Sequence, residues 1–389
     1  MSVAAPTLRG LARQRLALDP VLIGLSAALL LLGLVMVTSA SVTLAARDGD
    51  PFFFVERQLL FAGVGAGCAA LALRIPTRVW ERLSVVLLVV SFALLLLVLV
   101  PGIGHEVNGS RRWLRIAGLN FQASEAARVL LLVYLCSYLV RRDEELRAGL
   151  LGFLKPLAVL AAAALLLLIE PDFGSGVVLL VTGIGVLFLA GVRLRHLLAL
   201  CVAAALAFAL IAVSSAYRVK RLTAFLDPWA DPFNTGFQLT QSLIAIGRGE
   251  LTGVGLGASI QKLFYLPEAH TDFVFAVLAE ELGFAGILLV VALVLAIAWR
   301  ALAIARRAAE AGLKFQAYLA AAFGIWFGLQ AFINIGVNMG LLPTKGLTLP
   351  LLSYGRSSLV VTLGWLGILL RVHHETVSSR SAGPRGGVQ

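Results

Sequence analysis

Long apolar runs alternate with short polar segments along nearly the whole chain. A run of about 20 apolar residues can cross a hydrocarbon layer roughly 30 Å thick, where only a helix satisfies its own backbone polar groups. Each run therefore predicts a transmembrane helix, and the runs lie near 20–44, 52–73, 79–100, 121–140, 152–170, 173–192, 196–216, 282–303, 315–340 and 357–373. The expected fold class is all-α, a polytopic integral membrane protein of about ten transmembrane helices.

The longest interval between these runs, residues 217–281, is itself rich in apolar and aromatic residues. It starts with a proline-punctuated loop, followed by a helical pattern at 237–253 and another after Pro267. These patterns predict short helices at the outer membrane surface. Residues 20–373 are thus expected to form one membrane domain with a long outer loop at about 217–281, between a cytoplasmic segment 1–19 and a disordered cytoplasmic tail 374–389.

Composition and charge exclude an ordinary soluble protein. Of the 389 residues, 14% are charged, whereas soluble domains carry about 25%. If the N-terminus is cytoplasmic, nineteen of the 32 Lys and Arg residues fall in inner segments and twelve in outer ones. Because cytoplasmic segments are enriched in these residues, both termini are expected in the cytoplasm. Topology and anionic membrane lipids account for the net charge of +11, so nucleic acid is not implied as a partner.

Several polar groups interrupt the apolar pattern near the predicted outer surface. Arg111, Arg112 and Arg115 surround Trp113, either as an anion site with bidentate Arg contacts or as snorkelling cations beside an interfacial anchor. In residues 249–257, four glycines could present backbone N–H groups to a phosphate, but packing glycines are the alternative.

Ionisable residues also occur at or inside the apolar runs. Ser124 can cap a helix in which Glu125 and Arg128 form an i, i+3 pair, either as part of a site or as an internal ion pair. Glu170 and Asp172 are expected at an outer helix end, where a direct role for Asp172 competes with ordinary exposure. Residues 334–358 break a helix at membrane depth, which is tolerated where the backbone lines a cavity, and the side chains expected to face it are Lys345, Ser353, Tyr354 and Ser357.

Residues 267–283, PEAHTDFVFAVLAEELG, gather five ionisable side chains. On a helix running from Glu268, Asp272 and Glu281 lie about half a turn apart, so the acids do not form one cluster. Asp272 precedes seven apolar residues, and a partly desolvated carboxylate at such a boundary can serve as a general base. Glu280 and Glu281 are expected to orient the next helix by pairing with loop cations, and His270 is a loop histidine.

Four segments together resemble the SEDS family of bacterial cell-envelope proteins, the FtsW/RodA group, over about residues 19–373. They are RRWLRIAGLNFQASE at 111–125, EPDFGSG at 170–176, the long stretch at 225–283 that includes HTDF, and the segment at 334–358. Several of these residues look more like the division branch of the family than the elongation branch. Arg128 replaces the usual Lys, and Ala123, Glu250 and Arg356 replace the usual Pro, Gly and Gly.

The resemblance implies a ten-helix glycosyltransferase that polymerises lipid II outside the inner membrane at the division septum. The growing strand on undecaprenyl diphosphate would be the donor, and the lipid II 4-hydroxyl would be the nucleophile. Asp272 would be the catalytic base; Arg111, Arg112, Trp113, Lys345 and Ser353 would contact the substrate or its diphosphate; and the supporting residues would be Glu125, Arg128, Asp172, His270, Glu280, Glu281 and Arg356.

The same resemblance implies partners and a cofactor. A divalent cation, Mg²⁺ or Mn²⁺, would offset leaving-group charge, with ligands that the sequence does not identify and no organic cofactor. The expected protein partners are an FtsI-like class B penicillin-binding transpeptidase and division regulators of the FtsQ, FtsL and FtsB type. Three alternative functions stay open: a lipid II flippase or transporter, an elongation-specific polymerase of the RodA type, and a scaffold for the transpeptidase.

Overall fold

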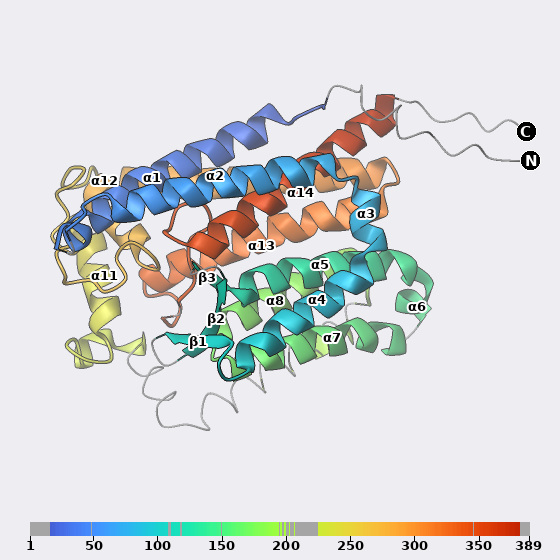
Figure 1. Cartoon of the computed structure of the whole chain (residues 1–389), viewed down its shortest axis with the longest axis horizontal. Helices are drawn as coiled ribbons and strands as arrows, with labels where there is room; N and C mark the ends of the chain where they lie inside the picture. The colour runs from blue at the N-terminus through green and yellow to red at the C-terminus, as the bar shows by residue number, and fades with distance from the viewer. Residues whose placement is uncertain are drawn as a thin grey trace, which may run out of the picture.

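The protein is a bundle of long helices with one small β-sheet, seen in a computed structural model (Figure 1). The structure describes residues 16–47, 49–107, 110–116, 119–148, 150–193, 195–196, 198–199, 202, 206, 225–344 and 346–381. The helices are α1 Pro20–Arg47, α2 Phe53–Arg74, α3 Thr77–Arg82, α4 Ser84–Leu99, α5 Ala123–Arg141, α6 Asp143–Ala148, α7 Leu150–Ile169, α8 Phe173–Leu189, α11 Phe237–Arg248, α12 Val274–Glu310, α13 Lys314–Asn338 and α14 Arg356–Ser381, with a 3₁₀ turn, η2, at Pro228–Ala230.

The helical fold class is confirmed. Among the described residues, six helices are long and apolar enough to cross a membrane, namely α1, α2, α5, α7, α12 and α13, and α4 and α8 are shorter apolar helices. Every predicted span coincides with a described helix or pair of helices except 196–216, most of which lies outside the described residues. The apolar runs predicted the positions of these helices because the length of a span depends only on consecutive residues.

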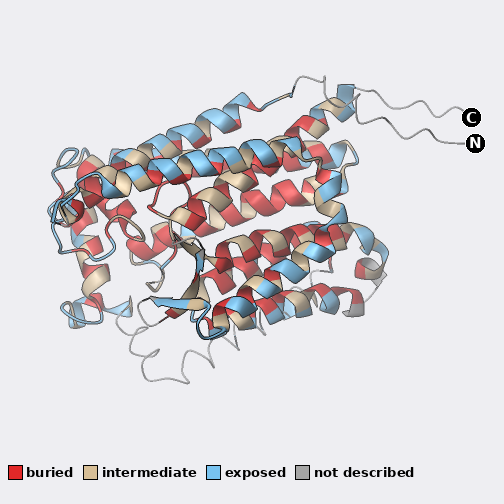
Figure 2. Cartoon of the chain, viewed as in Figure 1, coloured by how far each residue is buried: buried red, intermediate tan, exposed pale blue. Residues whose placement is uncertain are grey.

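Two helices form the centre of the bundle. In α5 and α13, 72% of the apolar window is buried, against 17–39% in the other four long helices. Figure 2 shows the same arrangement, with α13 and α5 largely red, α2 largely pale blue and tan, and α1 a mixture of buried and exposed residues. Polar side chains of these two central helices, such as Glu125 and Arg128 of α5 and Gln330 and Asn334 of α13, are buried in the protein rather than exposed to lipid. The two helices are therefore the scaffold for a buried site.

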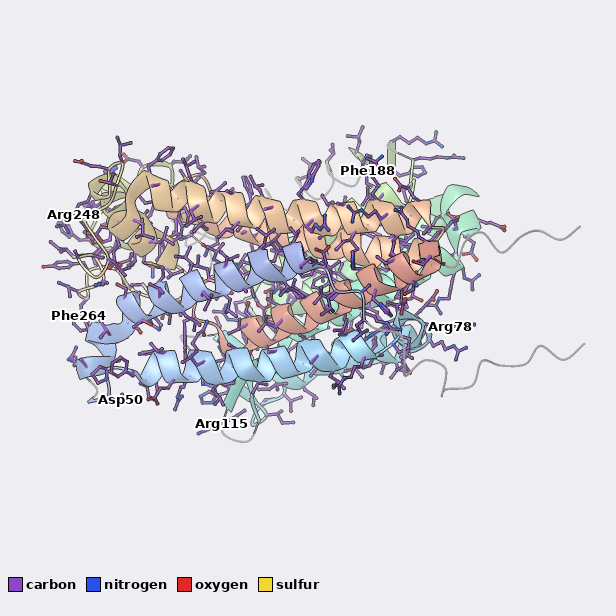
Figure 3. The ribbon with its side chains drawn as sticks, turned by 90° about the horizontal axis from the view of Figure 1, so that it is seen from above. Asp50, Arg78, Arg115, Phe188, Arg248 and Phe264 are labelled. Atoms are coloured by element: carbon purple, nitrogen blue, oxygen red, sulfur yellow. The ribbon has the colours of Figure 1, made fainter. Side chains whose placement is uncertain are left out.

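The bundle has two distinct ends. Asp50, Arg248 and Phe264 lie at one end and Arg78 lies at the other (Figure 3). The end with Arg248 carries α11, and the opposite end carries α3 and α6 (Figure 1). In the predicted orientation, the α11 end is periplasmic.

A three-stranded antiparallel sheet, which the sequence pattern did not predict, precedes α5. Its strands are β1 Gly104–Val107, β2 Ser110–Ile116 and β3 Leu119–Gln122, in the order β1-β2-β3. Ser110 and Leu114 are buried on one face of β2, as the two-residue period of a strand requires. The basic residues of this short segment hide that alternation from a hydropathy reading.

Two helix boundaries differ from expectation. The helix predicted from Glu268 begins at Val274, because residues 268–273 form turns in which the N–H groups of Thr271 and Phe273 donate to the carbonyl of Glu268. Helix α14 continues to Ser381, so residues 374–381, expected in the disordered tail, are helical, and residues 382–389 lie outside the described residues. Tertiary contacts stabilise this extension: Arg380 donates to Oε2 of Glu310 at 2.7 Å, and the main-chain N–H of Ala17 donates to Nδ1 of His374 at 3.1 Å.

The glycines after α11 allow a close backbone approach to α12. A Cβ atom on Gly249 would lie 1.9 Å from the carbonyl oxygen of Ala279, and one on Gly253 would lie 2.1 Å from that of Glu281. The N–H groups of Val254 and Gly255 donate to carbonyls of α12. The packing alternative is therefore correct for Gly249 and Gly253. Of the four glycine N–H groups proposed for phosphate, those of Gly249, Gly253 and Gly255 already donate to main-chain carbonyls.

The Gly249→Ala variant is expected to lower the melting temperature of the purified protein, whereas Gly247→Ala is expected to keep or raise it. Gly249 has no space for a methyl group, and overpacking of this kind costs about 1–3 kcal/mol. Gly247 lies inside α11 with no atom within 4 Å of an added Cβ, and Ala is favoured over Gly in a helix by roughly 0.5–1 kcal/mol. Thermal unfolding in detergent measures both, and equal melting temperatures would contradict the proposed packing.

Candidate active site around Asp272

Asp272 lies directly before α12, and its main chain is held by α13. The side-chain amides of Asn334 and Asn338 both donate to its carbonyl oxygen, at 2.9 and 3.0 Å. In the described part of the chain, no side chain forms a hydrogen bond with its carboxylate. The main chain is thus fixed while the carboxylate stays available to a ligand.

The same face of α13 also positions the segment after it. Gln330, Asn334 and Asn338 are spaced four residues apart, so they share one face of the helix. Asn334 donates to the carbonyl of Leu347 at 2.6 Å, and Gln330 donates to that of Thr348 at 3.1 Å. A Cβ atom on Gly346 would lie 2.9 Å from Oδ2 of Asp272. The segment that follows Lys345 therefore passes beside the carboxylate, although Lys345 itself lies outside the described residues.

The surroundings of Asp272 disfavour its charged form. Burial raises the pKa of its carboxyl to about 7, and Glu268 and Asp172 add repulsion, while the positive charge of Arg112 acts in the opposite direction. A carboxyl with this pKa changes protonation near neutral pH, which is the range in which a general base is most effective.

The structure separates the two arginines predicted to bind diphosphate. Arg112 shares the buried face of β2 with Ser110 and Leu114, and its Nε is buried with no hydrogen-bond partner among the described residues. Arg111 points to the other face, where it lies 3.6 Å from Oε2 of Glu106. Arg112 is therefore the better candidate for the site. Trp113, also on β2, is half-buried opposite Gln122 of β3.

Asp172 is buried, contrary to the expected exposed helix end. It caps α8 by accepting from the N–H of Ser175 at 3.2 Å, and its Oδ2 accepts from the hydroxyl of Ser124 at 2.8 Å and from the side-chain amide of Gln122 at 3.2 Å. Ser124 therefore does not cap α5, because α5 already begins at Ala123. Its hydroxyl instead binds the carboxylate that caps α8. The carboxylate is thus covered by Gln122, the last residue of β3, and by Ser124 of α5.

Glu170 is a buried acid that the sequence did not single out as a site residue. Both carboxylate oxygens are buried without a hydrogen-bond partner in the described structure. Burial, with a contribution from Asp172, raises the pKa of Glu170 to about 8, so the neutral form is favoured at pH 7. In the sequence, Glu170 was an acid expected at an outer helix end and the first residue of the EPDFGSG motif, and neither feature indicated its burial.

Glu125 and Arg128 form the predicted ion pair inside the bundle. Their side chains are 4% and 1% exposed, and Arg128 also donates to Oε1 of Gln330 at 3.2 Å. Because Gln330 in turn binds the carbonyl of Thr348, this pair links α5 to the segment beside Asp272. Through these contacts, Glu125 and Arg128 help to hold the segment beside Asp272 in place.

His270, Ser353 and Arg356 lie around the turn that leads into α14. The His270 ring is 4.6 Å from that of Phe54, and burial lowers the pKa of His270. The Ser353 hydroxyl accepts from the N–H of Leu349 at 2.8 Å, and Arg356 is the half-buried first residue of α14. Contact of Ser353 with substrate stays a prediction.

Glu280 and Glu281 are paired with loop cations, as predicted. Arg248 donates to Oε1 of Glu280, and Lys262 donates to Oε1 of Glu281, both at 2.7 Å. The hydroxyl of Ser39 on α1 also donates to Glu281. These contacts fasten α11 and the loop after it to α12. A hollow of about 650 Å³ lies between α1 and residues 256–263, and Asp272 does not line it.

The described side chains do not form a complete metal site. Within that part of the chain, no three His, Cys, Asp or Glu residues are grouped so that they could hold a metal ion. Mg²⁺ usually combines one or two carboxylates with water and substrate phosphate, so the predicted divalent cation does not fit as a metal held by the protein alone. The cofactor stays a prediction, and no catalytic step is assigned to it.

Comparison with known proteins settles the family. The family of cell cycle proteins that comprises FtsW, RodA and SpoVE matches residues 20–378. The chain belongs to this family. The SEDS relationship predicted from the motifs is therefore confirmed, and the protein is a multi-pass membrane protein.

Several FtsW/RodA/SpoVE relatives cover almost the whole chain. The probable peptidoglycan glycosyltransferase FtsW of Thioalkalivibrio sulfidiphilus is 57% identical over 353 residues, 90% of this chain and 88% of that protein. The probable peptidoglycan glycosyltransferase FtsW of Halorhodospira halophila is 54% identical, over 95% of this chain and 93% of that one.

Solved structures of the family have the same fold. A chain from a peptidoglycan synthase complex that coordinates polymerization and crosslinking matches with a TM-score of 0.77 at 32% identity, covering 93% of this chain and 99% of that one. The rod shape determining protein RodA of Thermus thermophilus matches with a TM-score of 0.68 at 30% identity, covering 92% and 98%.

Proposed function

We propose that this protein is the septal peptidoglycan glycosyltransferase of its cell, with Asp272 as the general base. The observation that carries the proposal is the arrangement around Asp272, whose main chain is fixed by two asparagines of α13 while its carboxylate stays free of hydrogen bonds to described side chains. The names of the FtsW relatives support the reaction type and the division role.

The proposed reaction is a single displacement at the donor sugar. Asp272 takes the proton of the lipid II 4-hydroxyl as that oxygen bonds to C1 of the growing strand. The bond between C1 and the diphosphate oxygen breaks, and its electron pair leaves with undecaprenyl diphosphate. The proton then passes from Asp272 to solvent. Arg112, whose Nε has no hydrogen-bond partner among the described residues, would stabilise the charge of the diphosphate. Lys345 is proposed to bind the same diphosphate.

Location and partners form part of the same proposal. Both termini are placed in the cytoplasm, and Asp272 is at the periplasmic end. The support for this orientation is the excess of Lys and Arg in the segments expected to be inner, nineteen against twelve. An FtsI-like transpeptidase is the proposed partner, because a related structure belongs to a complex that couples polymerization and crosslinking. Regulators of the FtsQ, FtsL and FtsB type are proposed from the division role.

The test is glycan-strand formation from purified lipid II by the detergent-solubilised protein with its cognate transpeptidase, with and without Mg²⁺ or Mn²⁺. A polymerase releases undecaprenyl diphosphate and forms strands, whereas a flippase or scaffold does neither. Absence of both products from an intact, folded complex would overturn the proposal. Strand formation unaffected by chelation of divalent cations would remove the predicted cofactor without affecting the rest.

Activity is expected to rise with pH through about 7. Because burial and neighbouring acids raise the pKa of Asp272 to about 7, its basic, ionised form is lost as the pH falls below that value. The rate under substrate saturation should fall about tenfold for each pH unit well below the pKa. A pH profile of initial rates between pH 5 and 9 checks this, and a rate that stays flat from pH 5 to 7 would contradict the assignment.

A further inference from the structure

A second hollow lies far from Asp272, at the end of the bundle that carries α3 and α6. It has a volume of about 260 Å³, and its lining comes from the start of α4 and the end of α5, through Val85, Leu88, Tyr134, Tyr138, Arg141 and Arg142. We refer to it as the α4–α5 hollow. None of these residues belongs to the candidate active site.

The α4–α5 hollow contains a hydrogen-bond donor without a partner. The hydroxyl of Tyr138 is buried and forms no hydrogen bond within the described structure. A buried hydroxyl without a partner destabilises the protein, so an acceptor that enters the hollow would be bound favourably. The Tyr134 ring lies 6.2 Å from that of Tyr138, centroid to centroid, and adds an apolar wall.

The charged groups around the hollow favour an anion. Glu145 is shared by Arg142 and Lys155, and Asp143 lies 2.8 Å from Lys314. Arg141 donates through Nε to the carbonyl of Ser137 at 3.4 Å and has no carboxylate partner in the part of the chain that is described. The dipoles of α4 and α5 roughly offset each other here, because α4 begins and α5 ends at the hollow. The positive charge at the α4–α5 hollow therefore comes from the guanidinium groups of Arg141 and Arg142 rather than from a helix dipole.

The apolar side of the hollow is continuous with a lipid-facing surface. Val85 and Val89 of α4 are 49% and 63% exposed, on a helix that contains only apolar residues and two serines. On a membrane-spanning helix such exposed side chains contact acyl chains. A ligand that uses the whole hollow thus needs a phosphate beside Arg141 and Tyr138 and hydrocarbon beside Val85 and Leu88.

We propose that the α4–α5 hollow binds one anionic glycerophospholipid, with its phosphate on Arg141, Arg142 and the Tyr138 hydroxyl and an acyl chain along α4. Basic pockets between transmembrane helices recognise anionic head groups in this way. The apolar lining makes a lipid a better occupant than free inorganic phosphate. The proposal does not depend on the catalytic role of Asp272.

The test is a titration of the full-length, detergent-solubilised protein with dioleoylphosphatidylglycerol or dioleoylphosphatidylcholine, followed by native mass spectrometry. The wild type is expected to bind phosphatidylglycerol about tenfold more tightly than phosphatidylcholine. Arg141→Gln should remove most of that preference, because it deletes the charged hydrogen bonds. Tyr138→Phe should weaken phosphatidylglycerol binding a few-fold while it preserves the ring packing.

The control is Arg78→Gln, which removes an exposed cation from the same end of the bundle without touching the hollow. It is expected to leave phosphatidylglycerol binding within about twofold of wild type. Melting temperatures establish that each variant is folded. Equal affinity of the wild type for the two lipids, or equal losses in Arg78→Gln and Arg141→Gln, would overturn the proposal. Displacement of phosphatidylglycerol by millimolar inorganic phosphate would identify a simple phosphate site instead.

Discussion

The Asp272→Asn protein is expected to form glycan strands at least about 100-fold more slowly than the wild type, because a general base typically contributes 10²–10⁴-fold. Asn is nearly isosteric with Asp, but its amide cannot take the proton of the lipid II hydroxyl at neutral pH. The fold should be preserved, because Asn334 and Asn338 hold the main-chain carbonyl of residue 272 rather than its side chain. Initial rates with purified lipid II, measured with equal amounts of folded complex, check the prediction.

Glu268→Gln is the matched control for that experiment. Glu268 lies four residues before Asp272, and its carboxylate accepts from the hydroxyl of Thr271 at 2.7 Å on an exposed turn. Its negative charge contributes to the raised pKa of Asp272, so its removal should move the pH profile toward lower pH and leave the maximal rate similar. If Asp272→Asn and Glu268→Gln have the same rate at every pH, Asp272 is not the base.

The second large effect is expected from Lys262→Met, which should destabilise the protein by about 3–5 kcal/mol. Lys262 and Glu281 form an ion pair whose side chains are 3% and 0% exposed. Without the ammonium group, the buried carboxylate keeps, among the described residues, the hydroxyl of Ser39 at 2.7 Å and the N–H of Ser259 at 3.4 Å. An uncompensated buried charge is much more costly than a missing pair. Thermal or denaturant unfolding in a fixed detergent measures the loss.

Two further variants isolate the cause of that loss. In Lys262→Met combined with Glu281→Gln, neither of these two positions leaves an unpaired buried charge, and most of the stability should return. Arg306→Met removes a cation that is 83% exposed and pairs with Glu310, and no measurable change is expected. The explanation fails if the double variant is no more stable than Lys262→Met, or if Arg306→Met is equally destabilised.

Much of the fold and part of the site followed from local sequence. Apolar length predicted the helices because the membrane imposes its thickness on each span separately. The Glu125–Arg128 pair was predictable because both partners are on one helix, three residues apart. The boundary position of Asp272 also followed from its neighbours, although a helix from Glu268 was wrongly expected around it. The motifs then identified the family, which the comparisons confirmed.

The sequence by itself thus determined where most of the long helices lie, where charge interrupts them and which carboxylate is at such a boundary, since each depends on residues close together in the chain. Tertiary structure decided the environment of that carboxylate. The two amides that hold Asp272 come from 62 and 66 residues away, and Gln330, which receives Arg128, is 202 residues from it. Arg111 and Arg112 lie on opposite faces of a β-sheet that the hydropathy pattern did not predict. Gln122 of the same sheet contacts the buried Asp172. Such contacts join residues distant in sequence, and only the packing of whole helices brings them together.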